Sequence, residues 1–386
     1  MKFFHLADLH LGKKVNGFSM LKDQRYVLEQ VLLEVAKEQP EAVLLAGDIY
    51  DHPIPSVGAV ALFDWFLTEL ANCAVPCLAV AGNHDSGVRL GFGSELLHEN
   101  GVHLSGVPTH QLQHVPFQRD GVRVEVWLLP FVRPAEAAAL FPEAEIKSYD
   151  DGVRVLLSHQ ALQPEACHLL LAHQFVTGAG KEPERSDSES VTVGGVDNVD
   201  SSAFDGFDYV ALGHLHGPQW VGDSCRYAGS PLQYSFSELR QQKGITIIEV
   251  AQDRGITVTQ IPLKPLHPLR EIRGPLNDLI QPDIVGQGDV EDYLRVTLTD
   301  ELEPENANAR LRAVYPNLMK LDFDNQRTRQ EAVLYGEEEP ENESLEALFS
   351  SFYEQQNGRE LDALGWDIVQ NVLETVGGEM LCGLLD

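Results

Sequence analysis

The stretch Ala81-Gly82-Asn83-His84-Asp85 is the part of the sequence from which the fold can be worked out. It follows an apolar run at residues 76–81, which predicts a buried strand. Small residues then allow a tight turn, after which an amide, an imidazole and a carboxylate come in succession. An amide oxygen can bind a hard metal ion, and an imidazole can donate or accept a proton. On its own, the stretch would also fit a polar turn closed by an Asn or Asp side chain.

Four other predicted strands end in residues of the same kind. They lie at residues 2–6, 42–46, 168–172 and 208–212, and they lead to Asp8-Leu9-His10, Gly47-Asp48, His173 and Gly213-His214-Leu215-His216. Residues two apart in an extended segment point the same way, so Asp8 and His10 share one space, as do His214 and His216. In α/β sheets, ligands gather beyond the carboxyl ends of the strands. Each strand end alone could be a capped turn or a structural histidine, but together they favour a metal site.

The candidate metal ligands are seven oxygen and nitrogen donors, with no cysteine among them: Asp8, His10, Asp48, Asn83, His173, His214 and His216. Carboxylate, imidazole and amide donors suit divalent ions such as Mn²⁺, Mg²⁺ or Fe²⁺. Seven donors are too many for one catalytic ion, but they suit two ions that share a carboxylate. The sequence therefore predicts a two-metal site.

The overall composition is that of a large folded protein. The chain has 386 residues, 43% of them hydrophobic, which is enough for a sizeable core and predicts two or three domains. No run reaches the roughly 20 apolar residues of a membrane span, and His5, Asp8 and His10 interrupt any signal-peptide core. The five cysteines have no Cys-x-x-Cys pairing, which suits a reducing compartment. We expect a cytoplasmic protein with no membrane contact.

The formal net charge of −31 is the most unusual bulk property of the chain. A simple nucleic-acid binder is expected to be basic, because an acidic surface repels the phosphate backbone. Either the substrate is not a polyanion, or local cations and a partner protein overcome the overall field. Most of the surface acids are expected to serve solubility.

The order of the predicted elements indicates an α/β fold with two packed mixed β-sheets flanked by helices. Amphipathic helices are expected at residues 20–38 and 56–72. The second of them is apolar nearly all round, so it lies either between the sheet and a neighbouring helix or also in a subunit contact. Strands expected at 122–129 and 153–157 follow each other with little helix between them, which predicts a second sheet packed on the first. The polar segment at 177–190 is expected to be a mobile loop beside the site, and His159 a surface residue.

As a set, these motifs resemble those of the calcineurin-like metallophosphoesterase superfamily: Asp8-x-His10, Gly47-Asp48, Gly82-Asn83-His84-Asp85, His173 and Gly213-His214-x-His216. Within the superfamily, the chain resembles the SbcD family, the nuclease subunits of bacterial SbcCD complexes. That narrower likeness lies in residues 3–12, 47–51 and 208–216, and above all in Tyr227-Ala-Gly-Ser-Pro-Leu-Gln-Tyr-Ser-Phe-Ser-Glu238. The similarity is almost continuous to about residue 265.

The resemblance implies a role for each site residue. One metal ion would be bound by Asp8, His10, Asp48 and His216, and the other by Asp48, Asn83, His173 and His214, with Asp48 as the bridge. His84 would not bind metal but would lie near the scissile phosphate, and Asp85 would orient His84. Arg89 would contact phosphate or hold its own loop, with the loop role favoured, and His52 has no assigned role. The two divalent ions would be Mn²⁺, with Mg²⁺ as the alternative.

The resemblance also implies the activity. The chain would be the metal-dependent nuclease of an SbcCD-like complex: a 3′–5′ exonuclease on double-stranded DNA and an endonuclease on single strands and hairpins, in DNA repair, replication and recombination. Two other classes stay open, namely a stand-alone phosphoesterase acting on a small molecule or a phosphoprotein, and a metal-free scaffold. The regions that follow residue 265 argue against the first class, and the complete ligand set argues against the second.

The pattern of segments divides the chain into four parts: a nuclease domain at residues 1–265, a capping domain at 266–335, an acidic linker at 336–344 and C-terminal helices at 345–386. The capping domain has predicted strands at 269–272, 293–298 and 318–323 and helical segments at 275–281 and 304–314. The helices after the linker carry apolar stripes, which either fold back on the body or dock on another chain. The resemblance implies docking, on an SbcC-like ATPase subunit. We also expect a homodimer of this chain, formed through the region of helix 56–72, within a heterotetramer that includes the ATPase subunit.

Overall fold

The computed structural model describes residues 1–178, 182–189 and 197–325, together with residues 328, 349–350, 353, 365–366 and 369. The chain divides into two compact units, Met1–Phe323 and Asp324–Asp386. The acidic linker predicted at 336–344 lies outside the described residues, as do the helices predicted at 345–386 apart from those single positions. All helices and strands with described bounds belong to the first unit.

The first sheet of this unit has six strands in the order β16-β15-β1-β4-β5-β6. The strands β1 (Lys2–Leu6), β4 (Ala42–Ala46), β5 (Cys77–Val80) and β6 (Val102–Ser105) run parallel to one another. The strands β15 (Gly244–Val250) and β16 (Ile256–Pro262) extend the sheet beyond β1 in antiparallel pairing. The strands β4 and β5 are buried along their whole length, as is usual for parallel strands covered on both faces.

The second sheet also has six strands, in the order β13-β14-β12-β9-β8-β7. Its parallel centre consists of β8 (Val122–Leu129), β9 (Cys167–His173), β12 (Tyr209–Gly213) and β14 (Cys225–Tyr227). The antiparallel strands β7 (Gln113–Arg119) and β13 (Gln219–Val221) form its edges. Side chains from both sheets, among them Phe3, Leu44, Val124 and Leu169, share one buried core. The prediction of two packed mixed sheets is therefore confirmed.

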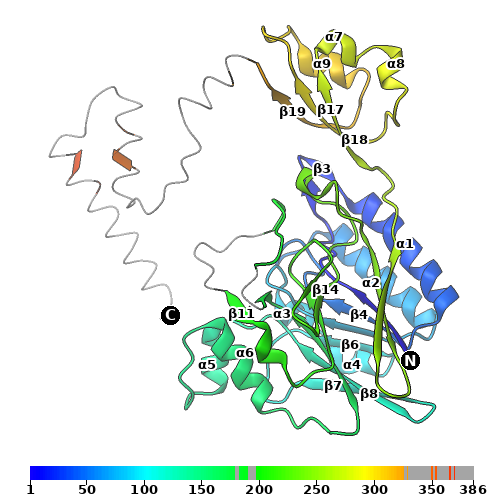
Figure 1. Ribbon diagram of the computed structural model, residues 1–386, viewed down its shortest axis with the longest axis vertical. Coiled ribbons are helices and arrows are strands. Elements are labelled where there is room, and N and C mark those ends of the chain that lie inside the picture. The colour runs from blue at the N-terminus through cyan, green and yellow to red at the C-terminus, as the bar shows by residue number, and fades with distance from the viewer. Residues whose placement is uncertain are drawn as a thin grey trace. The chain divides into compact units, whose positions relative to one another are not determined.

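Helices cover the outer face of each sheet (Figure 1). On the first sheet, α1 (Leu21–Glu38) and α2 (Val57–Asn72) share a core that includes Val31, Leu45 and Phe66. On the second sheet, α5 (Pro134–Leu140) and α6 (Tyr149–Ser158) share a core that includes Val153 and Leu170. The two sheets thus lie between two helical layers, which leaves the ends of the strands as the place where a site can open.

The strand expected at residues 153–157 is wrong, because these residues belong to α6. Ser148 caps this helix: its hydroxyl accepts a hydrogen bond from the Asp151 N–H at 3.1 Å, and the Asp151 carboxylate accepts one from the Ser148 N–H at 3.0 Å. Val153 and Leu156 are buried while Arg154 between them is exposed, which is the spacing of a helix with one apolar face. Periodicity alone does not separate a short apolar run in a helix from one in a strand, and the cap decides this case.

The apolar helix α2 is buried on one side only. Phe63, Phe66 and Leu70 pack in the core shared with α1, whereas Val57 is 87% exposed and Val60 is 45% exposed. The neighbouring helix therefore accounts for only part of the apolar surface of α2. The exposed part keeps the interpretation as a subunit contact open.

Residues 269–323 form a small α/β region with its own core. Its three parallel strands are β17 (Leu269–Gly274), β18 (Tyr293–Leu298) and β19 (Leu318–Phe323), and its helices are α7 (Leu276–Leu279), α8 (Pro282–Val285) and α9 (Ala307–Arg312). Asp23 of α1 joins this region to the larger one, since its carboxylate accepts hydrogen bonds from the Tyr293 hydroxyl at 2.9 Å and the His267 N–H at 3.1 Å. The strands and helices predicted here are present, and the proposed extension of the capping domain to residue 335 continues beyond the described residues.

Several short elements complete the unit: β2 (Lys14–Val15), β3 (Phe18–Ser19), α3 (Gly87–Leu90), α4 (Ser94–His98), β10 (Phe175–Thr177), β11 (Asn198–Asp200) and the 3₁₀ turns η1 (Ser201–Phe204) and η2 (Phe236–Glu238). Among the residues that the structure describes, no helix combines the length and the apolar character that crossing a membrane requires.

Candidate metal centre

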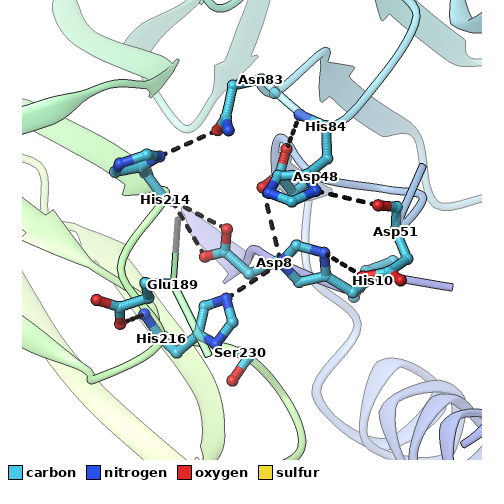
Figure 2. Close-up of polar contacts among 12 residues, drawn as sticks. Asp8, His10, Asp48, Asp51, Asn83, His84, Glu189, His214, His216 and Ser230 are labelled. Atoms are coloured by element: carbon cyan, nitrogen blue, oxygen red, sulfur yellow. Dashed lines mark hydrogen bonds and ion pairs between the residues drawn. The ribbon is translucent and has the colours of Figure 1, made fainter. Parts of the chain in front are cut away.

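The seven predicted ligands come together where the carboxyl ends of β1, β4 and β5 of the first sheet meet those of β9 and β12 of the second (Figure 2). The turns after β1 and β4 are joined by backbone hydrogen bonds, from the Asp8 N–H to the Gly47 carbonyl at 3.1 Å and from the His10 N–H to the Asp48 carbonyl at 2.9 Å. Both turns therefore hold their polar side chains in a defined place. Whether these side chains bind metal stays a prediction, and their geometry can be compared with what two ions require.

One group of donors consists of Asp8, His10 and His216, which are all buried. The Nε2 atoms of His10 and His216 lie 3.1 Å apart, and the potential ligand atoms of all three residues lie within 4.8 Å of one another. The Asp8 carboxylate also accepts hydrogen bonds from the His214 N–H, at 3.0 and 3.2 Å. This carboxylate therefore links the turn after β1 to the turn after β12.

A second group consists of Asn83, His173 and His214. The Asn83 Oδ1 atom lies 3.0 Å from His173 Nε2 and 3.0 Å from His214 Nδ1. On its other side, the His173 ring donates from Nδ1 to the Ala46 carbonyl at 2.8 Å, which leaves Nε2 facing Asn83. An amide oxygen and two imidazole nitrogens thus converge on one space.

Asp48 lies between the two groups (Figure 2). Its Oδ2 atom is 3.6 Å from His10 Nε2 and 3.4 Å from His173 Nε2. Its Oδ1 atom accepts a hydrogen bond from the His84 N–H at 2.9 Å, which fixes the orientation of the carboxylate. A carboxylate in this position is placed to bridge two ions.

The backbone of the site is strained at four of the seven candidate ligands. The φ angles of Asp8, His10, Asp48 and His214 are 54°, 43°, 48° and 108°, in the left-handed region. Residues other than glycine held in such conformations cost about 1–3 kcal/mol each, and they cluster at functional sites. Such strain is expected at a functional site, where the direction of the side chains matters more than the local stability of the backbone.

Glycines at the same strand ends give the ligands room. A Cβ atom on Gly82 would lie 2.1 Å from Asp48 Oδ1, and one on Gly213 would lie 1.8 Å from the Ala46 carbonyl oxygen. Neither contact is possible, so the glycine in each of these two motifs is required by the close approach of its neighbours. The sequence pattern of Gly followed by a donor therefore has a steric reason.

The electrostatics of the site fit a cation. Burial lowers the pKa of His10 to about 4 and that of His214 to about 3, so both rings are neutral near pH 7 and can offer a lone pair. Burial also disfavours a charged His173, but Asp48 and then Asp8 raise its pKa to about 9. In the protein alone, a proton on His173 thus compensates the charge of the buried Asp48 carboxylate. A divalent ion would supply that positive charge instead, and the carboxylate, imidazole and amide donors suit such an ion.

His84 and Asp85 lie in the turn after β5, beside Asp48. The His84 ring donates from Nδ1 to the Asp51 carbonyl at 3.0 Å, and its plane is perpendicular to the His10 ring, with centroids 4.9 Å apart. The buried Asp85 carboxylate accepts hydrogen bonds from three backbone N–H groups, those of Ile49, Tyr50 and Gly82, at 3.0, 2.9 and 2.9 Å. Asp85 thereby ties the His84 turn to the Asp48 turn. Burial and the nearby Asp48 charge raise its pKa to about 6.

Three other polar residues considered in the sequence analysis, Arg89, His52 and His159, are not among the candidate ligands. Arg89 donates from Nη1 to the Pro53 carbonyl at 3.1 Å, which is the contact that a loop-holding role requires. His52 is exposed, with its ring 3.3 Å from the Asp51 carboxylate. His159 is exposed on the end of α6, as expected for a surface residue.

Several residues around His216 were not predicted from the sequence as part of the site. They are Ser188, Glu189, Glu238 and Lys243, and all four form hydrogen bonds with His216 or with one another. Glu238 ends the motif at residues 227–238, which was the available signal, but nothing in that motif indicates which ligand it contacts. Ser188 and Glu189 lie in the segment expected to be a mobile loop, and its described part packs on His216 instead.

Comparison with known proteins identifies the family. A family model described as calcineurin-like phosphoesterase matches residues 1–218. The SbcD subunit of the SbcCD nuclease of Staphylococcus epidermidis is 31% identical over 97% of this chain and 99% of its own length. The chain belongs to the SbcD family of calcineurin-like phosphoesterases. The family is thus one of metal-dependent phosphodiesterases, and the resemblance drawn from the strand-end motifs is confirmed.

Two further similarities complete the comparison. Residues 265–357 match a family model described as type 5 capsule protein repressor C-terminal domain, SbcD_C, which begins where the nuclease-type fold ends. Among solved structures, TT1561 of Thermus thermophilus is 12% identical, with a TM-score of 0.37, over 67% of this chain and 98% of its own.

Proposed function

We propose that this SbcD-family chain is the nuclease subunit of an SbcCD-like complex and hydrolyses DNA phosphodiesters with two divalent metal ions. The observation that carries the proposal is the position of Asp48, whose single Oδ2 atom lies 3.6 Å from a nitrogen of one ligand group and 3.4 Å from a nitrogen of the other. A carboxylate in this position could bind both ions of a two-metal phosphodiesterase, whose ions act together on the attacking and leaving oxygens. The cleavage modes that we propose are a 3′–5′ exonuclease on double strands and an endonuclease on single strands and hairpins.

In this proposal, Asp8, His10, Asp48 and His216 hold one ion, and Asp48, Asn83, His173 and His214 hold the other. We propose Mn²⁺, with Mg²⁺ as the alternative, because the donors are oxygens and imidazoles without sulfur. When bound, such ions supply hydroxide from water near neutral pH and neutralise charge on the phosphoryl oxygens. The protein would hold the ligands in place through fixed backbone turns. It would hold the scissile phosphate between these ligands and His84.

His84 is proposed to act on the phosphate rather than on the metal. Its hydrogen bond from Nδ1 to the Asp51 carbonyl fixes the orientation of the ring beside Asp48. Potential ligand atoms of His84, His10 and Asp48 lie within 4.8 Å of one another, so a phosphate at the centre would be within reach of the ring. A protonated His84 would stabilise charge on the phosphate or protonate the leaving 3′ oxygen.

A groove beside the centre offers the local cations that an acidic chain needs in order to bind DNA. It has a volume of about 340 Å³ and is lined by Lys13, Lys14, Arg295 and Lys320, together with Ser188 and Tyr234. Carboxylates offset part of this charge, since Lys13 pairs with Asp51 at 2.7 Å and Arg295 with Asp322 at 2.6 Å. We therefore expect the groove to hold only a short stretch of backbone, and an SbcC-like ATPase subunit, docked through the helices predicted at 345–386, to hold the rest.

Exposed apolar residues support a homodimer. Val57 at the start of α2 is 87% exposed, and Phe92, which follows α3, is 85% exposed. The hydrogen bond from Arg89 to the Pro53 carbonyl holds these two segments beside each other. A double variant, Val57→Glu with Phe92→Glu, is expected to be monomeric by light scattering where the unchanged protein is a dimer. A monomeric unchanged protein would rule out this interface.

The activity is tested with a hairpin DNA in Mn²⁺ or Mg²⁺, with and without the ATPase subunit and ATP, beside an aryl phosphate. Under the proposal, the hairpin is cleaved in a metal-dependent way, and the ATPase subunit with ATP increases the rate on duplex ends. Faster hydrolysis of the aryl phosphate than of any DNA would instead favour a stand-alone phosphatase.

A further inference from the structure

The motif at residues 227–238 distinguishes this chain from other phosphoesterases, yet the proposed chemistry assigns no role to it. In the structure, its last residue, Glu238, and the following Lys243 lie against one candidate ligand, His216. The segment at 182–189 contacts the same ligand through Ser188 and Glu189. Two segments that are not themselves ligands therefore meet at His216.

His216 is held at three of its atoms. Its N–H donates to Glu189 Oε1 at 2.7 Å (Figure 2), and its carbonyl accepts from Lys243 Nζ at 2.7 Å. Its ring Nδ1 lies 2.7 Å from Ser188 Oγ and 3.4 Å from Glu238 Oε1. The backbone and the ring of this one residue are thus positioned by separate groups.

The direction of these hydrogen bonds follows from the charges. Lys243 is buried and lies 2.6 Å from Glu238 Oε2, so the pair forms a buried ion pair. The Ser188 hydroxyl donates its single proton to the Glu238 carboxylate, which leaves its oxygen to accept from His216 Nδ1–H. The other ring nitrogen, Nε2, then carries the lone pair, and this nitrogen lies 3.1 Å from His10 Nε2 in the ligand space.

We propose that Glu238 is a positioning residue for the ion held by His10 and His216. It acts through Ser188 to keep the His216 ring in the tautomer whose Nε2 faces the ion, with Lys243 as its counter-ion. The inference rests on the proposed metal centre and adds to it a dependence of one ion on residues 186–189. The ion held by Asn83, His173 and His214 lacks this dependence, because His173 is oriented by the Ala46 carbonyl.

Alternatively, the Glu238–Lys243 pair has a purely structural role. In that case the pair attaches the motif at residues 227–238 to β15 and does not affect the ring of His216. The two roles differ in the tautomer of His216 and in which ion is weakened. Carboxylates that orient metal-binding histidines change metal affinity by about 10–100-fold when they are removed. A structural pair would instead lower the stability of the fold and affect both ions alike.

The test uses the full chain with ¹⁵N-labelled histidine, free of metal, and the variants E238Q and S188A. The His216 signals are assigned by their loss in H216Q. We expect the Nδ1–H tautomer in the unchanged protein and a shift toward Nε2–H in both variants. The matched control is E189Q, which alters a contact to the backbone of His216 and should leave the tautomer unchanged. An unchanged tautomer in both E238Q and S188A would overturn the inference.

Titration with Mn²⁺ by calorimetry gives the second readout. We expect E238Q to weaken one of two binding events by about 10–100-fold and to leave the other within about twofold, with partial recovery in E238D. Equal weakening of both events would contradict the inference. S188A leaves the Glu238–Lys243 pair intact, so it answers the question even if E238Q fails to fold. Absence of Mn²⁺ binding to the unchanged protein would refute the proposed function, whereas the tautomer measurement would still decide the role of Glu238.

Discussion

The two sides of the candidate metal centre are supported in different ways. On the His173 side, the ring is oriented by the Ala46 carbonyl at the end of β4, and glycines leave no side chain between strand and ligand. On the His216 side, the ring is oriented by side chains from two segments distant in sequence, Ser188 and Glu238. The first side is therefore part of the sheet itself, whereas the second depends on side chains that can be changed without altering the sheet.

The two sides of the candidate centre are expected to respond differently to mutation. A strand end is held by the hydrogen bonds of the whole sheet, so the His173 side should persist for as long as the fold does. A shell of side chains can be lost locally, at a small fraction of the energy of unfolding. We expect the ion on the His216 side to be the one whose affinity varies with mutation.

Asp48→Asn is expected to have the largest effect, because Asp48 belongs to both sides. Its Oδ2 atom faces His10 and His173, and an amide there would remove the charge that the two ions share. We expect the loss of at least one bound ion and a decrease of DNA cleavage of about 10³-fold or more. Metal analysis of the purified variant and a hairpin cleavage assay check this. Two bound ions together with unchanged cleavage would show that Asp48 does not bridge them.

His84→Ala comes next, and it should separate chemistry from metal binding. His84 donates a hydrogen bond to Asp48 from its backbone N–H, and the variant keeps this bond. Cleavage is expected to fall by about 10²–10⁴-fold, the usual contribution of general acid–base catalysis, with both ions retained. The same metal analysis provides the control. Loss of an ion would place His84 among the ligands rather than at the phosphate.

Gly47→Ala tests the His173 side of the centre, and Gly17→Ala is its matched control. Gly47 and Gly17 both have left-handed backbones, with φ of 79° and 85°. A Cβ on Gly47 would lie 2.3 Å from His173 Nδ1, whereas one on Gly17 would have no atom within 4 Å. Both variants should lose about 1–2 kcal/mol of unfolding free energy from the backbone strain alone.

Only Gly47→Ala should in addition displace His173 and weaken the ion on that side, by about 10–100-fold if it acts like the loss of an orienting contact. Denaturant unfolding and Mn²⁺ calorimetry of both variants measure the two effects. Equal Mn²⁺ binding by the two variants would mean that the His173 ring does not need its present position.

A narrower effect, limited to the pH dependence of stability, is expected from His5, whose ring contacts β12. Its Nε2 lies 3.1 Å from the Leu212 carbonyl oxygen and its Nδ1 lies 3.2 Å from the Tyr209 hydroxyl, and burial lowers its pKa to about 3. The unfolded chain takes up a proton on this ring below the ordinary value of 6.5, while the folded protein does not, so stability is lost as the pH falls from 6.5 toward 3.

At pH 5 this loss is about 2 kcal/mol. In His5→Gln, the decrease in unfolding free energy between pH 7 and pH 5 should therefore be smaller by about that amount. Denaturant unfolding with a chelator present measures the decrease without interference from bound metal. An identical pH dependence in the two proteins would show that His5 is protonated in the fold.

The side chains that gather at the candidate centre could mostly be predicted, because their signal is local. A run of apolar residues followed by glycine and a donor marks a strand end, and this pattern recurs at Asp48, Asn83 and His214. The pattern failed at residues 153–157, where five consecutive residues do not distinguish a strand from one face of a helix. It also failed at Ser188 and Glu238, because neither follows a strand in a way that marks a ligand.

The sequence by itself determined which side chains follow the ends of the strands, since that depends only on neighbours along the chain. The tertiary structure alone decided which of them meet. His10 and His216 are 206 positions apart and their Nε2 atoms lie 3.1 Å from each other, because two separate sheets pack face to face with their parallel strands ending at the same edge. The physical reason is that packing brings together surfaces from distant parts of the chain. The partners of Ser188 and Glu238 therefore depend on how the sheets and loops fit together, and no pattern within either segment reveals them.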